Sequence, residues 1–284
     1  MKAMIFAAGL GTRLKPLTDQ MPKALVPVAE KPLIQHVIEK LTAAGYDDIV
    51  VNIHHFADML ERWIVNYQEE HPDIILRCSD EREKLLDTGG GIAHAGKLLT
   101  DHNNEGRFLI HNVDIISNVD LNKFNNSCVG TARHYGSGKS YAATLLVSER
   151  KTQRYLIFDE NMRLVGWTNI MTGEVKTPFP AVREAFDSSY MAPVDSAGIL
   201  TSPFFRPIGS GPYRLYAFAG IHQMSAELLP LMGGWPDRFS VIDFYLSLCR
   251  QYNIHGYVQP GLRLMDVGKA DYLDMAEEFV KSIK

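Results

Sequence analysis

A glycine-rich turn and two basic residues near the start of the sequence are the first groups that could do chemistry. The groups are Ala8, Gly9, Gly11, Thr12, Arg13 and, ten residues after Arg13, Lys23. Glycines let successive backbone N–H groups point at one anion, and fixed cations nearby attract a polyphosphate. The P-loop and the dinucleotide-binding pattern would both need glycine where Leu14 stands. The pattern therefore predicts a phosphate-binding loop of a different kind.

A carboxylate stands at the end of a later apolar run. Phe108–Val113 is followed by Asp114, and open α/β sheets bind ligands at the edge where their parallel strands end. An aspartate after a strand is also a common helix cap, so both roles are open here. Asp266 lies before a predicted C-terminal helix and has the same two interpretations.

The apolar pattern indicates how these residues are positioned. Short apolar runs, typical of strands buried on both faces, alternate with segments of helical spacing. The expected strands are 4–8, 49–53, 74–78 and 108–113, and the expected helices are 32–44, 57–69 and 90–99. This alternation predicts a Rossmann-like three-layer α/β/α fold with a mostly parallel, mixed central sheet.

Beyond Asp114 the sequence is richer in strands, some of which we expect to be antiparallel. Strands are predicted at 141–147, 155–158, 164–167 and 214–222, and helices at 240–252 and 269–284. The segment 172–212 is rich in proline and shows little periodicity, which is typical of a long functional loop. Without a clear linker or repeat, we expect one domain over 1–284.

Composition excludes several classes of protein. The 284 residues include 29 Lys and Arg against 33 Asp and Glu, a net charge of −4, with 46% hydrophobic residues. Enough apolar material is present to exclude dominant disorder, and the dispersed charge predicts no nucleic-acid or membrane partner. Three widely spaced cysteines suggest neither disulfides nor structural zinc. The apolar opening is far shorter than the roughly 20 residues of a membrane span, so we expect a cytoplasmic protein.

The first forty residues carry a motif that is more specific than its parts. It has the form GxGTRxxPxT, then PKxxxPV, then KP, and resembles the start of the sugar-phosphate nucleotidyltransferases. The matching residues are Gly9, Gly11, Thr12, Arg13, Pro16, Thr18, Pro22, Lys23, Pro27, Val28, Lys31 and Pro32. The resemblance implies that Arg13 and Lys23 are catalytic, because preorganised cations lower the barrier when a sugar 1-phosphate attacks a nucleoside triphosphate.

The same resemblance implies the other nucleotide and metal contacts. The turn at 86–92 is similar to the family's base-recognition turn, which adds Thr88, Gly89 and Gly90, with Asn112 at the next strand end. Asp114 and Asp266 are implied as ligands of Mg²⁺, which takes one or two carboxylates with substrate phosphates and water. The chain departs from the family in having Val113 where a glycine is usual.

The resemblance assigns residues 1–120 to the nucleotide and 121–284 to the sugar. Gly220 matches the strand glycine that approaches the sugar. The family's Glu-Lys pair is absent near 164–169, so Trp167 and Asn169 are the candidates there, each with a core or turn role as the alternative. The 172–212 segment could shape the sugar pocket or a contact between copies of the chain.

The implied substrates are a nucleoside triphosphate and a sugar 1-phosphate. The compact TGGG turn favours UTP with N-acetylmuramate 1-phosphate; GTP with mannose or heptose 1-phosphate is the alternative. A catalytically silent, nucleotide-sugar-binding regulatory subunit and a glycosyltransferase are further possibilities. The acidic pair Asp114 and Asp120 has the wrong spacing for the DxD motif of the latter. A homo-oligomer is also compatible with the sequence.

Overall fold

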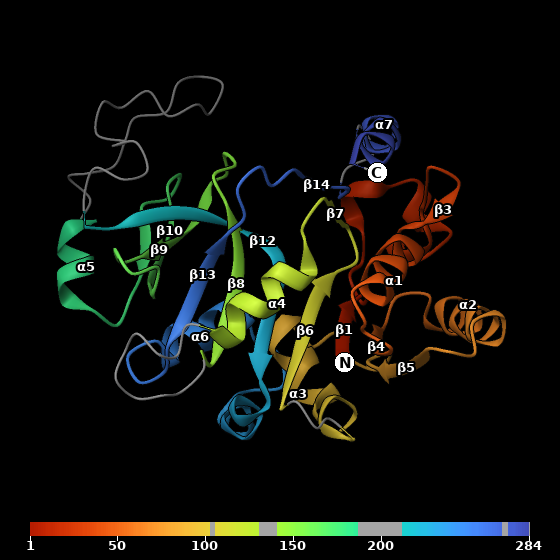
Figure 1. Cartoon of the computed structure of the whole chain (residues 1–284), viewed down its shortest axis with the longest axis horizontal. Coiled ribbons are helices and arrows are strands. Elements are labelled where there is room, and N and C mark those ends of the chain that lie inside the picture. The colour runs from red at the N-terminus through yellow and green to blue at the C-terminus, as the bar shows by residue number, and fades with distance from the viewer. Residues whose placement is uncertain (103–105, 131–140, 187–211, 269–271, 284) are drawn as a thin grey trace.

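The computed structural model describes residues 1–102, 106–130, 141–186, 212–268 and 272–283. Ten of the described strands form a mixed sheet with the order β11-β10-β9-β12-β6-β1-β4-β5, in which β8 also pairs with β12, and β13 with β8 (Figure 1). Helices cover both faces of this sheet. The predicted three-layer α/β/α fold is therefore confirmed.

The first half supplies the parallel strands. They are β1 (Lys2–Phe6), β4 (Asp48–Ile53), β5 (Ile75–Asp80) and β6 (Arg107–Asn112). β1 lies between β4 and β6 and pairs with both in parallel, with Ile5 opposite Val51 and His111. The predicted strands are confirmed with boundaries shifted by one or two residues. Their carboxyl ends meet at one edge, where the opening loop and Asp114 follow.

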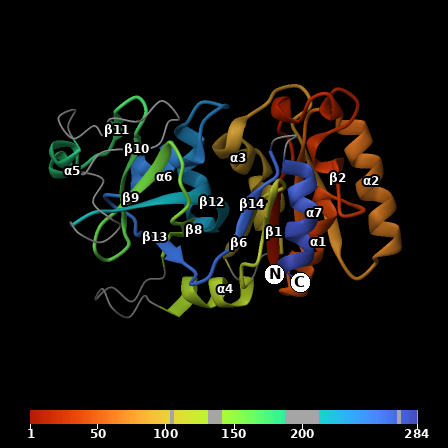
Figure 2. The same ribbon diagram turned by 90° about the horizontal axis from the view of Figure 1, so that it is seen from above.

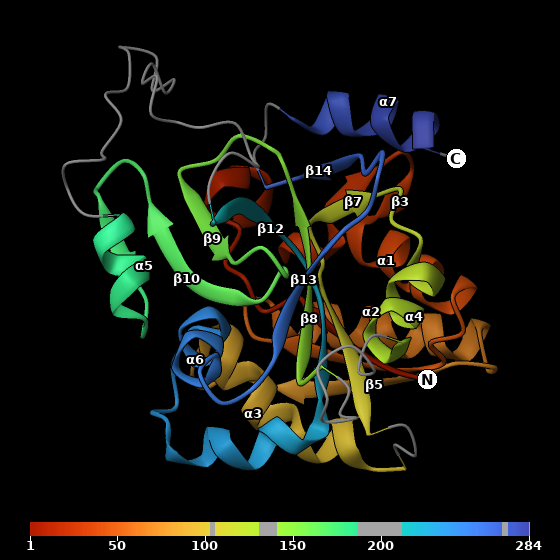
Figure 3. The ribbon, with the colours of Figure 1, turned by 60° about the vertical axis from the view of Figure 1, so that its left-hand side comes forward.

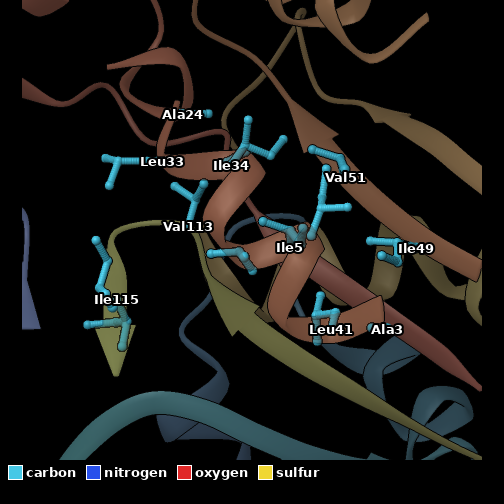
Figure 4. Close-up of a cluster of buried hydrophobic side chains, with 14 of the residues drawn as sticks. Ala3, Ile5, Ala24, Leu33, Ile34, Leu41, Ile49, Val51, Val113 and Ile115 are labelled. Carbon is cyan, nitrogen blue, oxygen red and sulfur yellow. The ribbon is translucent and has the colours of Figure 1, made fainter. Parts of the chain in front are cut away.

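Helices pack on the two faces through alternate strand residues. One face carries α1 (Leu33–Ala43), α2 (Ala57–Glu70), α4 (Leu121–Gly130) and α7 (Leu273–Ile283); the other carries α3 (Asp87–Thr100), the 3-10 helix η6 (Ala226–Gly234) and α6 (Val241–Leu248). Figure 2 shows α1, α2 and α7 on one side of β1 and α3 on the other. Ile5 points into the first core, with Ile34 and Val51 (Figure 4), and Met4 into the second. No helix in the described ranges is long and apolar enough to cross a membrane.

The second half adds mainly antiparallel pairs. Its strands are β8 (Ala143–Ser148), β9 (Arg154–Phe158), β10 (Leu164–Asn169), β11 (Glu174–Lys176), β12 (Arg214–Ser225) and β13 (Ile254–Val258). β12 pairs antiparallel with β6, β8 and β9 and so joins the two halves. Its register shifts around Gly220, which has φ +75°. The expected antiparallel members are therefore present.

Four short elements complete the site region. The 3-10 helices η1 (Thr12–Leu14) and η3 (Lys23–Leu25) follow β1. β7 (Ile115–Ser117) follows Asp114 and pairs antiparallel with β14 (Leu264–Asp266), as Figure 3 shows. This small ribbon brings a C-terminal segment to the end of β6.

Several expectations need correction. The helix predicted at 240–252 ends at Leu248, because residues 249–252 turn toward β13. The 172–212 segment is not wholly a loop, since it includes β11 and α5 (Pro180–Ala185); residues 187–211 lie outside the described ranges. The start of the helix expected at 269–284 also lies outside them, and α7 is described from Leu273. Sequence reasoning missed α4, η6 and β13.

Candidate active site

Lys23 and two aspartates meet at the end of β6. The Lys23 ammonium group forms an ion pair with the carboxylate of Asp114. The Asp114 carbonyl oxygen accepts a hydrogen bond from the Val267 N–H at 2.8 Å, and Asp266 lies opposite Ile115 in the β14–β7 pair. Both predicted metal-binding carboxylates are therefore brought into one place.

Asp266 is a half-buried carboxylate in surroundings that suit a cation. Its Oδ1 is buried and has no hydrogen-bond partner among the described residues. Burial raises the pKa of Asp266 above its ordinary value, and the charge of Asp114 raises it further. The positive charges of Lys23, Arg13 and Arg150 act in the opposite direction. All three cations thus lie close enough for their charges to act on this carboxylate.

The donor set fits Mg²⁺. Asp114 and Asp266 offer two neighbouring carboxylates, and one oxygen of Asp266 has no partner within the described ranges. No cluster of three or more His, Cys, Asp or Glu suited to a metal occurs in the part of the chain that the structure describes. Further ligands would therefore come from substrate phosphates and water, which is the usual arrangement for Mg²⁺.

Arg13 lies beside Asp266, and Gly268 makes room for both side chains. A Cβ atom on Gly268 would lie 2.6 Å from Asp266 Oδ1 and 2.8 Å from Arg13 Nη2. Those distances are too short for a carbon atom, so only glycine fits without displacing one of the two side chains. The two predicted catalytic cations therefore lie on the same acidic pair, Arg13 next to Asp266 and Lys23 on Asp114.

The opening loop presents backbone donors that the protein itself does not use. Within the described residues, the N–H groups from Gly9 to Arg13 donate no backbone hydrogen bond. Gly11 has φ +63°, and its carbonyl oxygen accepts from the Thr18 hydroxyl at 2.8 Å. A Cβ on Gly11 would lie 2.7 Å from Thr18 Cγ2. Gly9 and Thr12 are exposed and Ala8 is buried, so this loop has the form of an anion cradle.

The N-terminal turn of α3 packs against the segment before α6. Gly89 donates its N–H to the Phe239 carbonyl oxygen at 2.8 Å, and the Thr88 hydroxyl accepts from the Val241 N–H at 3.0 Å. A Cβ on Gly90 would lie 2.0 Å from the Asp237 carbonyl oxygen. Thr88, Gly89 and Gly90 therefore have packing roles whether or not they also contact a base.

Two of the three predicted sugar-side residues line a cavity of about 530 Å³ beside β9, β10 and β11. Trp167 and Asn169 share this cavity with Arg150, Arg154 and Lys176. Lys176 lies opposite Trp167 in the strand pair, with its ammonium 5.2 Å from the indole centroid. Glu174 and Asp243 also line the cavity, and Asp243 pairs with Lys176 at 2.9 Å, so the lining combines an aromatic ring with charges of both signs.

Asn112 and Gly220 also meet. A Cβ on Gly220 would lie 2.9 Å from Asn112 Nδ2, so the glycine allows β12 to approach the end of β6. The positive φ of Gly220 coincides with the register shift of β12. Asn112 and Gly220 therefore meet where β6, from the predicted nucleotide half, pairs with β12, from the predicted sugar half.

Arg150 and Lys176 were missed by sequence reasoning. Arg150 lies in a run of charged residues after β8, and its guanidinium donates to the Phe218 carbonyl oxygen at 3.1 Å. It lines the sugar-side cavity and also lowers the pKa of Asp266, so its charge acts on both parts of the site. No sequence signal distinguished it from neighbouring charged residues. Lys176 could have been predicted as a neighbour of Trp167 only if the pairing of β10 with β11 had been known.

One known protein family matches the first part of the chain. Residues 2–157, more than half of the chain, match the family described as nucleotidyl transferase. The chain belongs to this nucleotidyl transferase family. The match includes the opening loop, Lys23, the α3 turn and Asp114, while Asp266 lies beyond it.

Two curated relatives are similar over parts of their length. An N-acetylmuramate alpha-1-phosphate uridylyltransferase from Caulobacter vibrioides is 47% identical over 116 residues, which are 40% of this chain and 46% of the relative. A mannose-1-phosphate guanyltransferase beta-A from Xenopus laevis is 40% identical over 249 residues, 88% of this chain and 64% of the relative. The chain thus spans less than two thirds of the length of each.

A solved structure shares the fold of this nucleotidyl transferase family member over its whole length. A putative glucose-1-phosphate thymidylyltransferase from Bacillus anthracis superposes with a TM-score of 0.68 and 16% identity, covering 100% of this chain and 96% of that one. At this identity the likeness concerns the fold.

Proposed function

We propose that this protein joins a nucleoside triphosphate and a sugar 1-phosphate to give a nucleotide sugar and pyrophosphate. The observation that carries the proposal is the cluster of Lys23, Asp114, Asp266 and Arg13 at the end of β6, beside a loop of unused N–H donors. Membership of the nucleotidyl transferase family supports the same reaction class.

The reaction needs positive charge more than it needs a base. An oxygen of the sugar phosphate attacks the α-phosphorus, a P–O bond forms, and the bond from that phosphorus to the bridging oxygen of the β-phosphate breaks. Pyrophosphate leaves with the electron pair. The attacking oxygen is already ionised at neutral pH, so no side chain has to remove a proton.

Arg13 and Lys23 supply the charge. Lys23 is held by the Asp114 carboxylate before substrate arrives, and Arg13 lies close enough to Asp266 for its charge to act there, so little rearrangement is needed. Charge aimed at the oxygens of the α-phosphate stabilises the transition state, in which the negative charge of two phosphates is brought together. The N–H groups of Gly9 to Arg13 would bind the remaining phosphate oxygens.

Asp114 and Asp266 would hold Mg²⁺. When bound, the ion neutralises phosphate charge and orients the triphosphate. The two carboxylates would keep the positive charge of the ion at the end of β6. The hydrogen bond from the Val267 N–H to the Asp114 carbonyl oxygen fixes the spacing of the two aspartates.

The cavity with Trp167 and Asn169 is the proposed sugar site. Its aromatic ring offers an apolar face to a sugar ring, and Asn169 offers an amide in the lining. Gly220 lies where β12 closely approaches Asn112, and we place the sugar phosphate near this point. Thr88, Gly89 and Gly90 are the proposed contacts of the base.

We propose UTP and N-acetylmuramate 1-phosphate as the substrates, supported by the relative of that name with 47% identity. GTP with mannose 1-phosphate is the second candidate, supported by the longer alignment to a mannose-1-phosphate guanyltransferase. The two differ in both base and sugar, so one experiment separates them.

The test is pyrophosphate release with Mg²⁺ over a grid of nucleoside triphosphates and sugar 1-phosphates. The sugars are N-acetylmuramate, N-acetylglucosamine, glucose, mannose and heptose 1-phosphates. Release with UTP and N-acetylmuramate 1-phosphate alone would support the first pair, and release with GTP and mannose 1-phosphate the second. If the protein binds nucleotide but releases pyrophosphate with none of the substrate pairs, the proposed enzymatic activity is contradicted and a regulatory subunit is favoured.

A further inference from the structure

A buried asparagine links the opening loop to the neighbouring strand. Asn52 lies in β4 and is 3% exposed. Its side-chain oxygen accepts hydrogen bonds from the N–H groups of Ala7, at 2.7 Å, and Ala8, at 3.2 Å. These two residues begin the proposed phosphate-binding loop, so Asn52 fixes the point at which the loop leaves β1.

The amide of Asn52 continues the link to a buried glutamate. Asn52 Nδ2 donates to Glu81 Oε1 at 2.8 Å, and Glu81 is also 3% exposed. The other carboxylate oxygen of Glu81 accepts from the N–H of Leu86 at 3.3 Å. Leu86 immediately precedes α3, whose first turn contains the proposed base contacts. One chain of hydrogen bonds thus runs from the loop to that turn.

Gly91 makes room for this pair. A Cβ on Gly91 would lie 2.8 Å from Glu81 Oε1 and 3.3 Å from Asn52 Nδ2. The third glycine of the Gly89–Gly91 triplet therefore faces the buried pair, whereas the first two face Phe239 and Asp237. This contact gives a reason for glycine at position 91, which the proposed phosphate and base contacts do not explain.

The direction of every hydrogen bond in the chain is determined. Two N–H donors hold the oxygen of Asn52, so its amide must face Glu81. Glu81 then has a donor at each of its oxygens and must accept twice. A buried group that loses its partner pays the full cost of leaving water, so neither side chain is freely replaceable.

We propose that Asn52 and Glu81 are positioning residues that hold the phosphate-binding loop and the α3 turn in one fixed relation, and so set the affinity for the nucleoside triphosphate. The inference rests on the proposed function, because it assigns the two ends of the chain to one ligand. Neither side chain needs to touch that ligand, since both are buried and fully engaged with protein atoms.

Exchange of donor and acceptor provides the sharpest test. Glu81→Gln puts an NH₂ group against either the Asn52 amide or the Leu86 N–H, and Asn52→Asp puts two carboxylate oxygens together. The double variant Asn52→Asp/Glu81→Gln satisfies every bond again, because the introduced amide donates to the introduced carboxylate and still accepts from Leu86.

The readouts are calorimetric binding of UTP and of GTP, KM for each substrate, and thermal unfolding. For the nucleotide that the wild type binds, we expect each single variant to weaken binding about tenfold, with KM for the sugar 1-phosphate unchanged. The double variant should recover the affinity to within about threefold of wild type. A merely structural role would lower the unfolding temperature without this split between the two substrates.

Gly91→Ala is the second test, with Gly96→Ala as its matched control in the same helix. A Cβ on Gly91 collides with the buried pair, whereas one on Gly96 would, among the described residues, meet only the Leu229 side chain at 3.8 Å. We expect weaker nucleotide binding for the first variant and unchanged binding for the second.

The outcomes separate the inference from the function on which it rests. Folded single variants that bind nucleotide as tightly as the wild type would overturn the positioning role. A double variant that regains its unfolding temperature but not its affinity would overturn it as well. A wild-type protein that binds neither nucleotide would instead overturn the proposed function.

Discussion

Lys23 forms an ion pair with Asp114, 91 residues further along the chain, and both side chains are largely buried, with 11% and 15% of their surface exposed. Asp266 lies beside this pair, and its Oδ1 has no hydrogen-bond partner in the part of the chain that the structure describes. The two aspartates are therefore expected to respond differently to the loss of their charge.

Asp114→Asn and Asp266→Asn should both abolish most turnover, by about a hundredfold or more, but only the first should destabilise the fold. Asp114→Asn leaves the buried Lys23 ammonium without its counterion, which costs about 1–3 kcal/mol of unfolding free energy. Asp266→Asn removes a carboxylate disfavoured by burial and by its acidic neighbour. Pyrophosphate release and urea unfolding measure the two effects. The exposed Asp73→Asn is the control, and equal destabilisation by both site variants would contradict the assignment.

Gly268→Ala should impair catalysis through Arg13. The added Cβ would meet Arg13 Nη2 and Asp266 Oδ1 at less than 3 Å, so one of these side chains must move. We expect turnover to fall about ten- to a hundredfold, because misplaced charge loses most of its effect on the transition state. Gly233→Ala is the matched control, since no atom of the described residues lies within 4 Å of the Cβ it would add. Steady-state kinetics on both variants would decide, and equal activity would argue against a positioned Arg13.

Arg150→Ala should weaken binding of the sugar 1-phosphate. Arg150 lines the cavity with Trp167, and its charge reaches Asp266, so it lies between the sugar site and the acidic pair. Loss of one charged contact to a phosphate should raise KM for the sugar 1-phosphate about tenfold and leave nucleotide affinity unchanged. The neighbouring exposed Lys151→Ala provides the control. An increase confined to KM for the nucleotide would place Arg150 on the other substrate.

Acid should destabilise the protein through buried histidines. Burial lowers the pKa of His222 to about 3 and that of His255 to about 4, from an ordinary value of 6.5. The unfolded chain therefore binds more protons than the folded one between about pH 6.5 and pH 4, and stability falls as pH is lowered through this window. Each histidine contributes up to about 1.4 kcal/mol per pH unit.

His222→Phe should reduce that pH dependence. The ring lies among aromatic neighbours, 5.5 Å from Phe218 and 5.7 Å from Tyr245 between centroids, so phenylalanine suits the site. Unfolding temperatures from pH 8 to pH 4.5 would test this, with the exposed His102→Gln as control. An unchanged slope would show that His222 does not titrate on unfolding in this range.

The sequence predicted those parts of the molecule whose signals are local. The strands β1, β4, β5 and β6 are short apolar runs, and burial on both faces is what such runs require. Asp114 was expected at a ligand-binding edge because it follows one of them. Its neighbour Asp266 was expected from a short motif, and the β14–β7 pair brings the two together.

The rest depends on contacts between distant segments. The parallel pairing of β13 with β8 has no local signal, and neither does the cap that Thr88 gives to the N-terminus of α6. Arg150 looks like any exposed charge in a polar run. Asn52 did carry a signal, since it is a polar residue within the apolar run 49–53, but its partner Glu81 lies among charged residues that conceal it.

The pairing of β12 with β6 has a consequence for dividing this protein into pieces. A fragment of residues 1–120 would keep β6, but its outer edge would lose the antiparallel partner that covers it. Five of the six residues of β6 are buried, and Phe108, Leu109 and Ile110 form an apolar run. An open, apolar edge of this kind recruits strands from other molecules. We therefore expect the isolated fragment to aggregate on expression, and co-expression of residues 121–284 to restore solubility.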